Sequence, residues 1–175
     1  MRAEHEREYV EFVAARALML RRTAYRLCGD WHRAEDLAQT ALIRLYRHWA
    51  LARGADNLDA YARRSLVNAY LDDQRRWWAR RVTPVPEPDP RSTAPSGPDP
   101  DHNLDLMAAL ARLAPRQRAV LVLRYWEGLD VAATAEALGC AVGTVKSQTS
   151  AAIAALRRLL PGYVSERLTA GRDVA

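Results

Sequence analysis

The segment LDVAATAEALGCAVGTVKSQTSAAIAALRRLL, residues 129–160, decides the fold. Asp130 stands where a helix N-cap is preferred, and it precedes three apolar side chains at helical spacing: Val131, Ala135 and Leu138. Gly139 follows at once, and glycine is the residue that most readily ends a helix in the left-handed backbone conformation. Cys140 and Ala141 complete a tight turn before the next apolar run. The spacing therefore predicts a helix-turn-helix.

The second helix of this motif continues with one stripe of mostly apolar residues at three-four spacing: Val142, Val145, Thr149, Ala152, Leu156 and Leu159. That spacing turns four other residues outward, on the face that would enter a major groove: Lys146, Ser147, Ser150 and Ala151. Lys146 is the only lysine in a chain with 25 arginines. The alternative interpretation is a small helical hairpin with a solvated polar face.

The charge distribution indicates a partner that carries phosphates. The 175 residues have a net charge of +5, and their length allows one or two domains, each with its own core. Residues 1–81 carry a net charge of +5 and residues 104–160 a net charge of +3, whereas residues 82–103 carry −3. Neutralising phosphates releases counterions, so two basic blocks joined by an acidic connector suit a nucleic acid.

Cysteine content and hydropathy indicate an intracellular protein. Cys28 and Cys140 are the only cysteines, both at apolar or turn positions, and we expect them to be unpaired. No apolar run follows the charged start, and no stretch approaches 18 apolar residues. We therefore expect a soluble, cytoplasmic protein with no membrane partner.

Three amphipathic helices are expected in the first 81 residues. The first spans about residues 4–28, with Gly29 ending it and Asp30 capping the second, which runs to about Trp49. After a loop, a third helix is expected over about 58–81. Its outward stripe holds Asn68, Asp72, Arg75 and Arg76, and it closes with aromatics among cations: Trp77, Trp78, Arg80 and Arg81.

Residues 82–103 hold seven of the nine prolines and almost nothing apolar. Proline removes backbone donors and restricts the preceding residue, so this composition predicts a flexible, extended linker. A second unit begins near Leu104, and Pro115 suits the first position of a helix over residues 116–127. The fold class predicted is therefore all-α, with two small helical domains at 4–81 and 104–160, the linker between them and a short tail at 161–175.

Three motifs carry a resemblance to a known family. RAEDLAQ at residues 33–39, LAPRQR at 113–118 and GTVKSQ at 143–148 resemble bacterial extracytoplasmic-function (ECF) sigma factors, and among these the actinobacterial SigE-like group. The resemblance covers nearly the whole chain except the linker and the tail. It implies a sigma region 2 helical bundle at 4–81 and a sigma region 4 helix-turn-helix at 104–160.

The resemblance also implies partners and roles for individual residues. Core RNA polymerase would bind the chain through its clamp and its flap. The second helix would dock on the clamp through Asp36, Gln39, Leu42, Ile43 and Arg44. The third helix and the loop before it would melt the minus-10 promoter element and hold a flipped base, through Asn57, Asn68, Asp72, Arg75 and Arg76. An asparagine side chain can pair with the edge of an extruded base. An anti-sigma factor is a further partner that the resemblance allows.

The recognition helix departs from the family pattern. The resemblance assigns minus-35 DNA binding to Thr144, Lys146, Ser147 and Ser150. Many members of the family have an arginine where this chain has Ala151, and others have one where Gln148 stands. We therefore expect minus-35 contacts that are fewer or differently aimed.

Two other classes of function fit the sequence less well. A two-domain DNA-binding regulator that acts without polymerase would need no polymerase-docking face. An enzyme would have to use one of four scattered histidines: His5, His32, His48 or His102. The sequence has no metal-ligand spacing, nucleophile motif or glycine-rich phosphate loop, so no catalytic residue, metal or cofactor is predicted.

Overall fold

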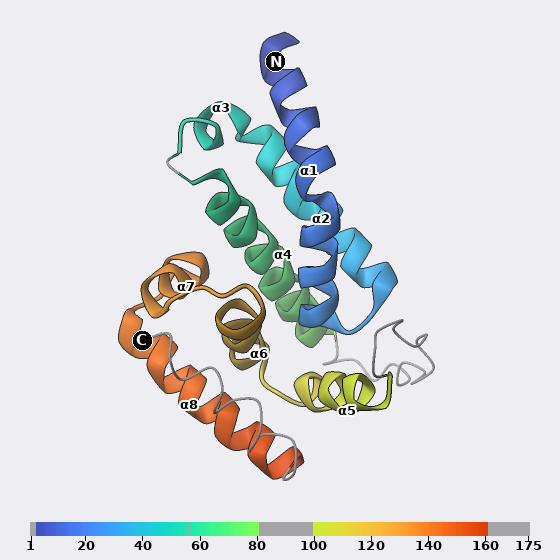
Figure 1. Cartoon of the computed structure of the whole chain (residues 1–175), viewed down its shortest axis with the longest axis vertical. Helices are drawn as coiled ribbons and strands as arrows, with labels where there is room; N and C mark the ends of the chain where they lie inside the picture. The colour runs from blue at the N-terminus through green and yellow to red at the C-terminus, as the bar shows by residue number, and fades with distance from the viewer. Residues whose placement is uncertain (1–2, 56, 81–99, 161–175) are drawn as a thin grey trace.

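The computed structural model describes residues 3–55, 57–80 and 100–160, and these residues form helices and turns without any strand (Figure 1). The first unit contains α1 (Ala3–Cys28), α2 (Trp31–Arg47), α3 (Trp49–Ala52) and α4 (Leu58–Arg80). The second contains α5 (Pro100–Ala111), α6 (Pro115–Leu121), the π-helical turn η1 (Val122–Trp126), α7 (Val131–Leu138) and α8 (Val142–Leu159). The predicted all-α class is confirmed.

The long helices of the first unit pack through the apolar stripes that their sequence periodicity predicts. Leu20 of α1, Leu45 of α2 and Leu66 of α4 are fully buried, and Trp49 and Tyr70 are nearly so. Burying a leucine side chain of this kind contributes about 1.5–3 kcal/mol. Local caps fix where the helices begin: the Asp30 carboxylate accepts a hydrogen bond from the Arg33 backbone N–H at 2.7 Å at the start of α2.

The helix-turn-helix forms as the sequence predicts. The Asp130 side chain caps α7 by accepting a bond from the Ala133 backbone N–H at 2.7 Å, and Gly139 ends that helix with φ +60°. Val145, Ala152 and Leu156 of α8 are buried, as expected. Val142 is not, since 43% of it is exposed. As the first residue of α8, it lies before the point at which the stripe reaches the core, so its assignment to the buried stripe was wrong.

The helix expected over residues 116–127 is α-helical only as far as Leu121, after which the π-helical turn η1 follows. Two further helix boundaries differ from the prediction. The helix expected to reach Trp49 ends at Arg47, and a short new helix, α3, starts after His48. At the other boundary, α5 starts at Pro100, inside the segment assigned to the linker. A proline fits the first position of a helix and an acidic residue after it is favoured by the helix dipole, so the helix extends upstream of its apolar residues. The remainder of the predicted linker and the tail at 161–175 lie outside the described residues.

The two units pack on each other, and this was not predicted. One cluster of buried side chains runs continuously from Leu20, Leu66 and Tyr70 of the first unit to Val122 and Leu138 of the second. The second unit also has a smaller cluster of its own, formed by α5, α6 and α8 around Leu110 and Leu156. In Figure 1, α6 and α7 lie against α4, and α6 also lies against the C-terminal end of α1. The second unit therefore has a core of its own beside the larger core that it shares with the first unit.

Candidate polymerase and nucleic-acid interface

A groove of about 110 Å³ lies between α2 and α4 in the first unit. It brings together residues that the sequence assigns to two different partners. Asp36 and Arg44 come from the predicted polymerase face, and Asp72 and Arg76 come from the predicted minus-10 face. Its full lining is Arg33, Asp36, Leu37, Thr40, Arg44, Ala69, Asp72, Asp73 and Arg76. The predicted polymerase face of α2 and the predicted minus-10 face of α4 therefore lie next to each other at this groove.

An ion-pair network spans this groove. Asp72 Oδ2 accepts a hydrogen bond from Arg44 Nη2 at 2.9 Å, and Asp72 Oδ1 accepts one from Arg75 Nη2 at 2.5 Å. A second pair joins Arg33 Nη2 to Asp73 Oδ2 at 2.6 Å. About a third of the Asp72 side chain is exposed. Because both of its carboxylate oxygens bind arginine, Asp72 is arranged to position cations rather than to meet a base directly.

The outer face of α2 offers both polar and apolar groups to a partner. Asp36, Gln39 and Ile43 are exposed, and Ile43 shows 53% of its surface. Leu42 is different: it packs against the core, and its carbonyl oxygen accepts a hydrogen bond from the Tyr9 hydroxyl at 3.0 Å. Of the five residues predicted to bind polymerase, Leu42 and Arg44 are therefore half-buried and the other three are exposed.

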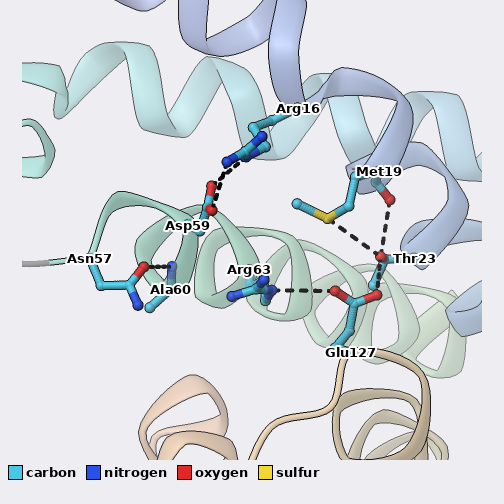
Figure 2. Close-up of polar contacts among 8 residues, drawn as sticks. All are labelled: Arg16, Met19, Thr23, Asn57, Asp59, Ala60, Arg63 and Glu127. Atoms are coloured by element: carbon cyan, nitrogen blue, oxygen red, sulfur yellow. Dashed lines mark hydrogen bonds and ion pairs between the residues drawn. The ribbon is translucent and has the colours of Figure 1, made fainter.

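The predicted minus-10 residues fall in two places. Asn57 caps α4, since its side-chain oxygen accepts a bond from the Ala60 backbone N–H at 2.9 Å (Figure 2). Asn68, Arg75 and Arg76 are exposed further along α4. The helix ends beside Trp78, which is 61% exposed and lies edge-on to Trp77, with the ring centroids 5.5 Å apart. Exposed arginines next to a solvent-facing indole suit a single strand, whose phosphates and bases they can contact.

The recognition helix α8 presents its polar face to solvent. Lys146, Ser147 and Ser150 are exposed, and Thr144 is half-buried. The Ser147 hydroxyl donates to the Thr144 carbonyl at 3.0 Å, which leaves the oxygen lone pairs of Ser147 as acceptors. The Thr149 hydroxyl donates to the Val145 carbonyl at 2.7 Å. Lys146 is therefore the strongest hydrogen-bond donor among the exposed residues at the start of this helix.

Comparison with known proteins decides the family. Residues 12–81 match the model of sigma-70 region 2, and residues 103–156 match that of sigma-70 region 4. The RNA polymerase sigma-E factor of Streptomyces coelicolor is 42% identical over 158 residues, covering 87% of this chain and 86% of that protein. The ECF RNA polymerase sigma factor SigL of Mycobacterium tuberculosis is 34% identical, covering 82% and 84%. The chain belongs to the ECF group of sigma-70 family sigma factors.

The fold of this sigma factor is also that of a solved relative. The structure of the sigma factor RpoE from Bartonella quintana, solved in complex with the anti-sigma factor NepR, matches with a TM-score of 0.75. The match has 25% sequence identity and covers 89% of this chain and 98% of that one. The family resemblance seen in the three sequence motifs is thereby confirmed.

Two residues of this sigma factor that sequence reasoning missed lie between its two units. Glu127 follows η1, and its carboxylate accepts hydrogen bonds from the Thr23 hydroxyl at 2.6 Å and from Arg63 Nε at 3.3 Å (Figure 2). Only 7% of the Glu127 side chain is exposed. No local pattern could reveal this contact, because Thr23 is 104 residues away and Arg63 is 64 residues away.

Arg118 is the second residue that was missed. It is 4% exposed, and its Nε donates to the Arg26 carbonyl at 2.8 Å, near the end of α1. Burial lowers the pKa of the Arg118 guanidinium and raises the pKa of the neighbouring Tyr70 hydroxyl to about 12. No local pattern predicts this burial, because the carbonyl that Arg118 binds is 92 residues away.

The described residues include no group of three or more His, Cys, Asp or Glu side chains that could hold a metal ion. Among the same residues, no helix has the length and hydropathy that crossing a membrane requires.

Proposed function

We propose that this sigma factor binds core RNA polymerase, recognises minus-35 and minus-10 promoter elements and initiates transcription by opening the duplex. The observation that carries the proposal is the order of parts along the chain. A region 2 unit with an exposed α2–α4 face precedes a region 4 unit with an exposed recognition helix. Each partner is then assigned a surface of its own.

Polymerase docks on the outer face of α2. Asp36, Gln39 and Ile43 provide a mixed polar and apolar patch, and Arg44 lies beside it in the groove. An exposed isoleucine is typical of the centre of a protein interface, and the hydrogen-bonding groups around it are typical of the rim. The clamp of polymerase is the partner proposed for this face, and the flap is the partner proposed for region 4.

Promoter opening is assigned to the outer face of α4. Asn68 is placed to pair with an extruded base, and Arg75 and Arg76 are placed to hold phosphates of the unpaired strand. Asp72 orients Arg75 toward that strand and Arg44 toward polymerase, because its carboxylate binds both. Asn57 contributes by fixing the start of α4 next to the preceding loop.

Promoter recognition at minus-35 is assigned to α8. Lys146 is placed to reach guanine O6 and N7, and Thr144, Ser147 and Ser150 are placed to bond bases or phosphates. The protein performs no covalent chemistry in this scheme and needs no metal or cofactor. It works in the cytoplasm, where polymerase and promoter DNA meet. The match to a sigma factor solved with an anti-sigma factor supports a regulator of that class as an additional partner.

Co-purification with core polymerase followed by run-off transcription tests the proposal. We expect a stable holoenzyme and promoter-dependent transcripts. Changing Asn68 to Ala should preserve the closed complex and lower the permanganate reactivity of minus-10 thymines, because the residue acts only on the opened strand. Failure to bind core polymerase would exclude the proposal, and unchanged thymine reactivity would remove the role of Asn68.

A further inference from the structure

We propose that the outer face of α1 is a self-association surface, on which a second copy of this chain packs with its own α1 in antiparallel orientation. The proposal goes beyond the proposed function, which assigns partners to α2, α4 and α8 and leaves this face without one. Four exposed residues define the face, which we call the α1 seam: Glu11, Ala15, Leu18 and Arg22. In Figure 1, α1 runs along one side of the first unit.

The four residues of the α1 seam lie in one line along the helix. Each residue advances about 100° around the helix axis, so steps of four, three and four residues keep all of them within about 60° of arc. At a rise of about 1.5 Å per residue, Glu11 and Arg22 are separated by about 16 Å along the axis. Alternating steps of three and four residues are the spacing by which paired helices contact each other in coiled coils.

The middle of the α1 seam is apolar and open to solvent. Leu18 is 57% exposed, whereas Leu20 and Leu27 of the same helix are fully buried. One exposed leucine is ordinary on a protein surface, but this one lies beside Ala15, whose small side chain lets another helix approach closely. A large residue of one helix placed over a small residue of the other is the fit that packed helices use.

The charges of α1 are divided between its two halves. Residues 3–15 contain four glutamates and one arginine, whereas residues 16–28 contain four arginines and no acidic residue. The helix dipole favours acidic groups in the first turn and basic groups in the last turn only. Because Glu11 and Arg22 lie outside those turns, the dipole does not account for the charge at either end of the α1 seam.

The two charges of the α1 seam are available to a partner. Arg16 and Arg21 are used within the chain, where they form ion pairs with Asp59 and Glu35. Arg22 differs from both, because its guanidinium forms no hydrogen bond or ion pair with any described residue. The same holds for the carboxylate of the seam glutamate. Each end of the seam therefore offers one exposed charge, and the two charges have opposite sign.

This arrangement is complementary to itself. When two copies of α1 lie antiparallel, Glu11 of one copy faces Arg22 of the other, and Ala15 faces Leu18. Two-fold symmetry repeats each of these contacts. A parallel pair would instead bring like charges together at both ends, which disfavours that orientation. A nucleic acid is a poor partner for this face, because its phosphates would meet the acidic half of the helix.

The small size of the α1 seam indicates a weak and reversible dimer. One face of one helix buries less than the roughly 1,200 Å² that marks the lower limit of stable protein complexes. We therefore expect a Kd on the order of 10–100 µM. Added salt should raise this Kd, because the pairs of Glu11 with Arg22 lie at the rim of the contact.

Sedimentation velocity of the full-length chain, at concentrations up to about 200 µM, tests the proposal. We expect the parent to dimerise, and Glu11→Arg and Arg22→Glu each to raise the Kd by about tenfold or more, because like charges then meet at both ends. An equimolar mixture of the two variants should dimerise like the parent. In that mixed pair the introduced arginine faces the introduced glutamate, and the native Glu11 faces the native Arg22.

Leu18→Gln should also weaken the dimer, and Leu51→Gln is its matched control. Leu51 is 72% exposed but lies on α3, outside the α1 seam, so its replacement should leave the Kd unchanged. A parent chain that stays monomeric over the whole range would overturn the proposal. A dimer that resists both charge reversals would do the same, and a mixture of the two variants that fails to associate would exclude the antiparallel pairing.

Titration of core polymerase keeps this proposal separate from the proposed function. The seam variants should bind core polymerase as the parent does, because the α1 seam is not part of the α2 face. If the parent fails to bind core polymerase, the proposed function is lost, and sedimentation still decides whether the dimer exists. A monomeric parent whose Leu18→Gln variant loses core binding would assign the α1 seam to polymerase and overturn self-association.

Discussion

The two polar clusters of this sigma factor use the same chemistry in opposite surroundings. In the cluster between the units, Glu127 joins Thr23 and Arg63 and is almost fully shielded from water. In the cluster of the α2–α4 groove, Asp72 joins Arg44 and Arg75, with about a third of each partner or more in contact with solvent. A shielded carboxylate stabilises the protein's own arrangement, whereas an exposed one leaves its arginines available to a polymerase or a phosphate.

Removing the carboxylate from the shielded cluster should have the largest effect. Glu127→Ala leaves the Arg63 guanidinium without its acceptor, and the Thr23 hydroxyl keeps only the Met19 carbonyl, 3.0 Å away. We expect the free energy of unfolding to fall by about 2–3 kcal/mol. Urea denaturation of the full chain measures this loss. Glu136→Ala, on the exposed side of α7, should change the same quantity by less than about 0.5 kcal/mol. Equal losses in the two variants would contradict the distinction between the clusters.

Replacing an exposed residue of the recognition helix should have the reverse effect. Promoter binding should weaken, and the free energy of unfolding should stay the same. Lys146→Ala should cost about 1–3 kcal/mol of holoenzyme binding to a matched promoter and relax the preference at one minus-35 position, because we propose that the lysine contacts a base. Its unfolding free energy should equal that of the parent. Titration across salt on matched and scrambled minus-35 duplexes measures the loss of affinity and the change in base preference. A loss that is the same on every sequence would show that Lys146 contacts phosphate only.

Ala151→Arg is the matched gain-of-contact variant on the same helix. Ala151 is exposed, and it stands where many ECF sigma factors have an arginine. An added cation on this face should raise promoter affinity and steepen the salt dependence, with the buried Val145 and Ala152 undisturbed. Unchanged binding in both this variant and Lys146→Ala would show that α8 does not read the promoter.

These contrasts also explain what the sequence could and could not predict. The helix-turn-helix was predictable because its signals are local: an aspartate cap, an apolar period and a glycine at φ +60° within ten residues. The outward placement of Asn68 and Lys146 followed from the same periodicity. Such signals report which face of a helix is buried.

Contacts between distant residues gave no such signal. Glu127 reads as a surface acid near the end of a helix, and only the packing of the units shows that it lies against Thr23. Arg118 belongs to a motif that indicates the family, yet its burial at the end of α1 depends on a carbonyl 92 residues away. The core shared by the two units was not predicted for this reason, since composition and periodicity do not indicate which apolar faces pack together.

Within the shielded cluster, the hydroxyl should contribute less than the carboxylate. Thr23→Val keeps the volume of the side chain and removes one hydrogen bond to Glu127, so the free energy of unfolding should fall by about 1–2 kcal/mol. Thr40→Val, an exposed threonine of the groove, is the control and should have almost no effect. Urea denaturation of both variants gives the comparison, and an equal response would mean that the Thr23 hydroxyl adds nothing beyond packing.

The smallest stability change is expected in the exposed cluster. Asp72→Asn weakens the bonds to Arg44 and Arg75, but water and salt already screen these ion pairs. The free energy of unfolding should therefore change by no more than about 0.5 kcal/mol. A double-mutant cycle with Arg44→Gln, followed by urea denaturation at low and high salt, isolates the pair. We expect a coupling that shrinks as salt is added, together with weaker core binding because Arg44 loses the group that orients it. A coupling energy as large as the loss expected for Glu127→Ala, and insensitive to salt, would show that the groove stabilises the fold. The reason for assigning the groove to a partner would then be lost.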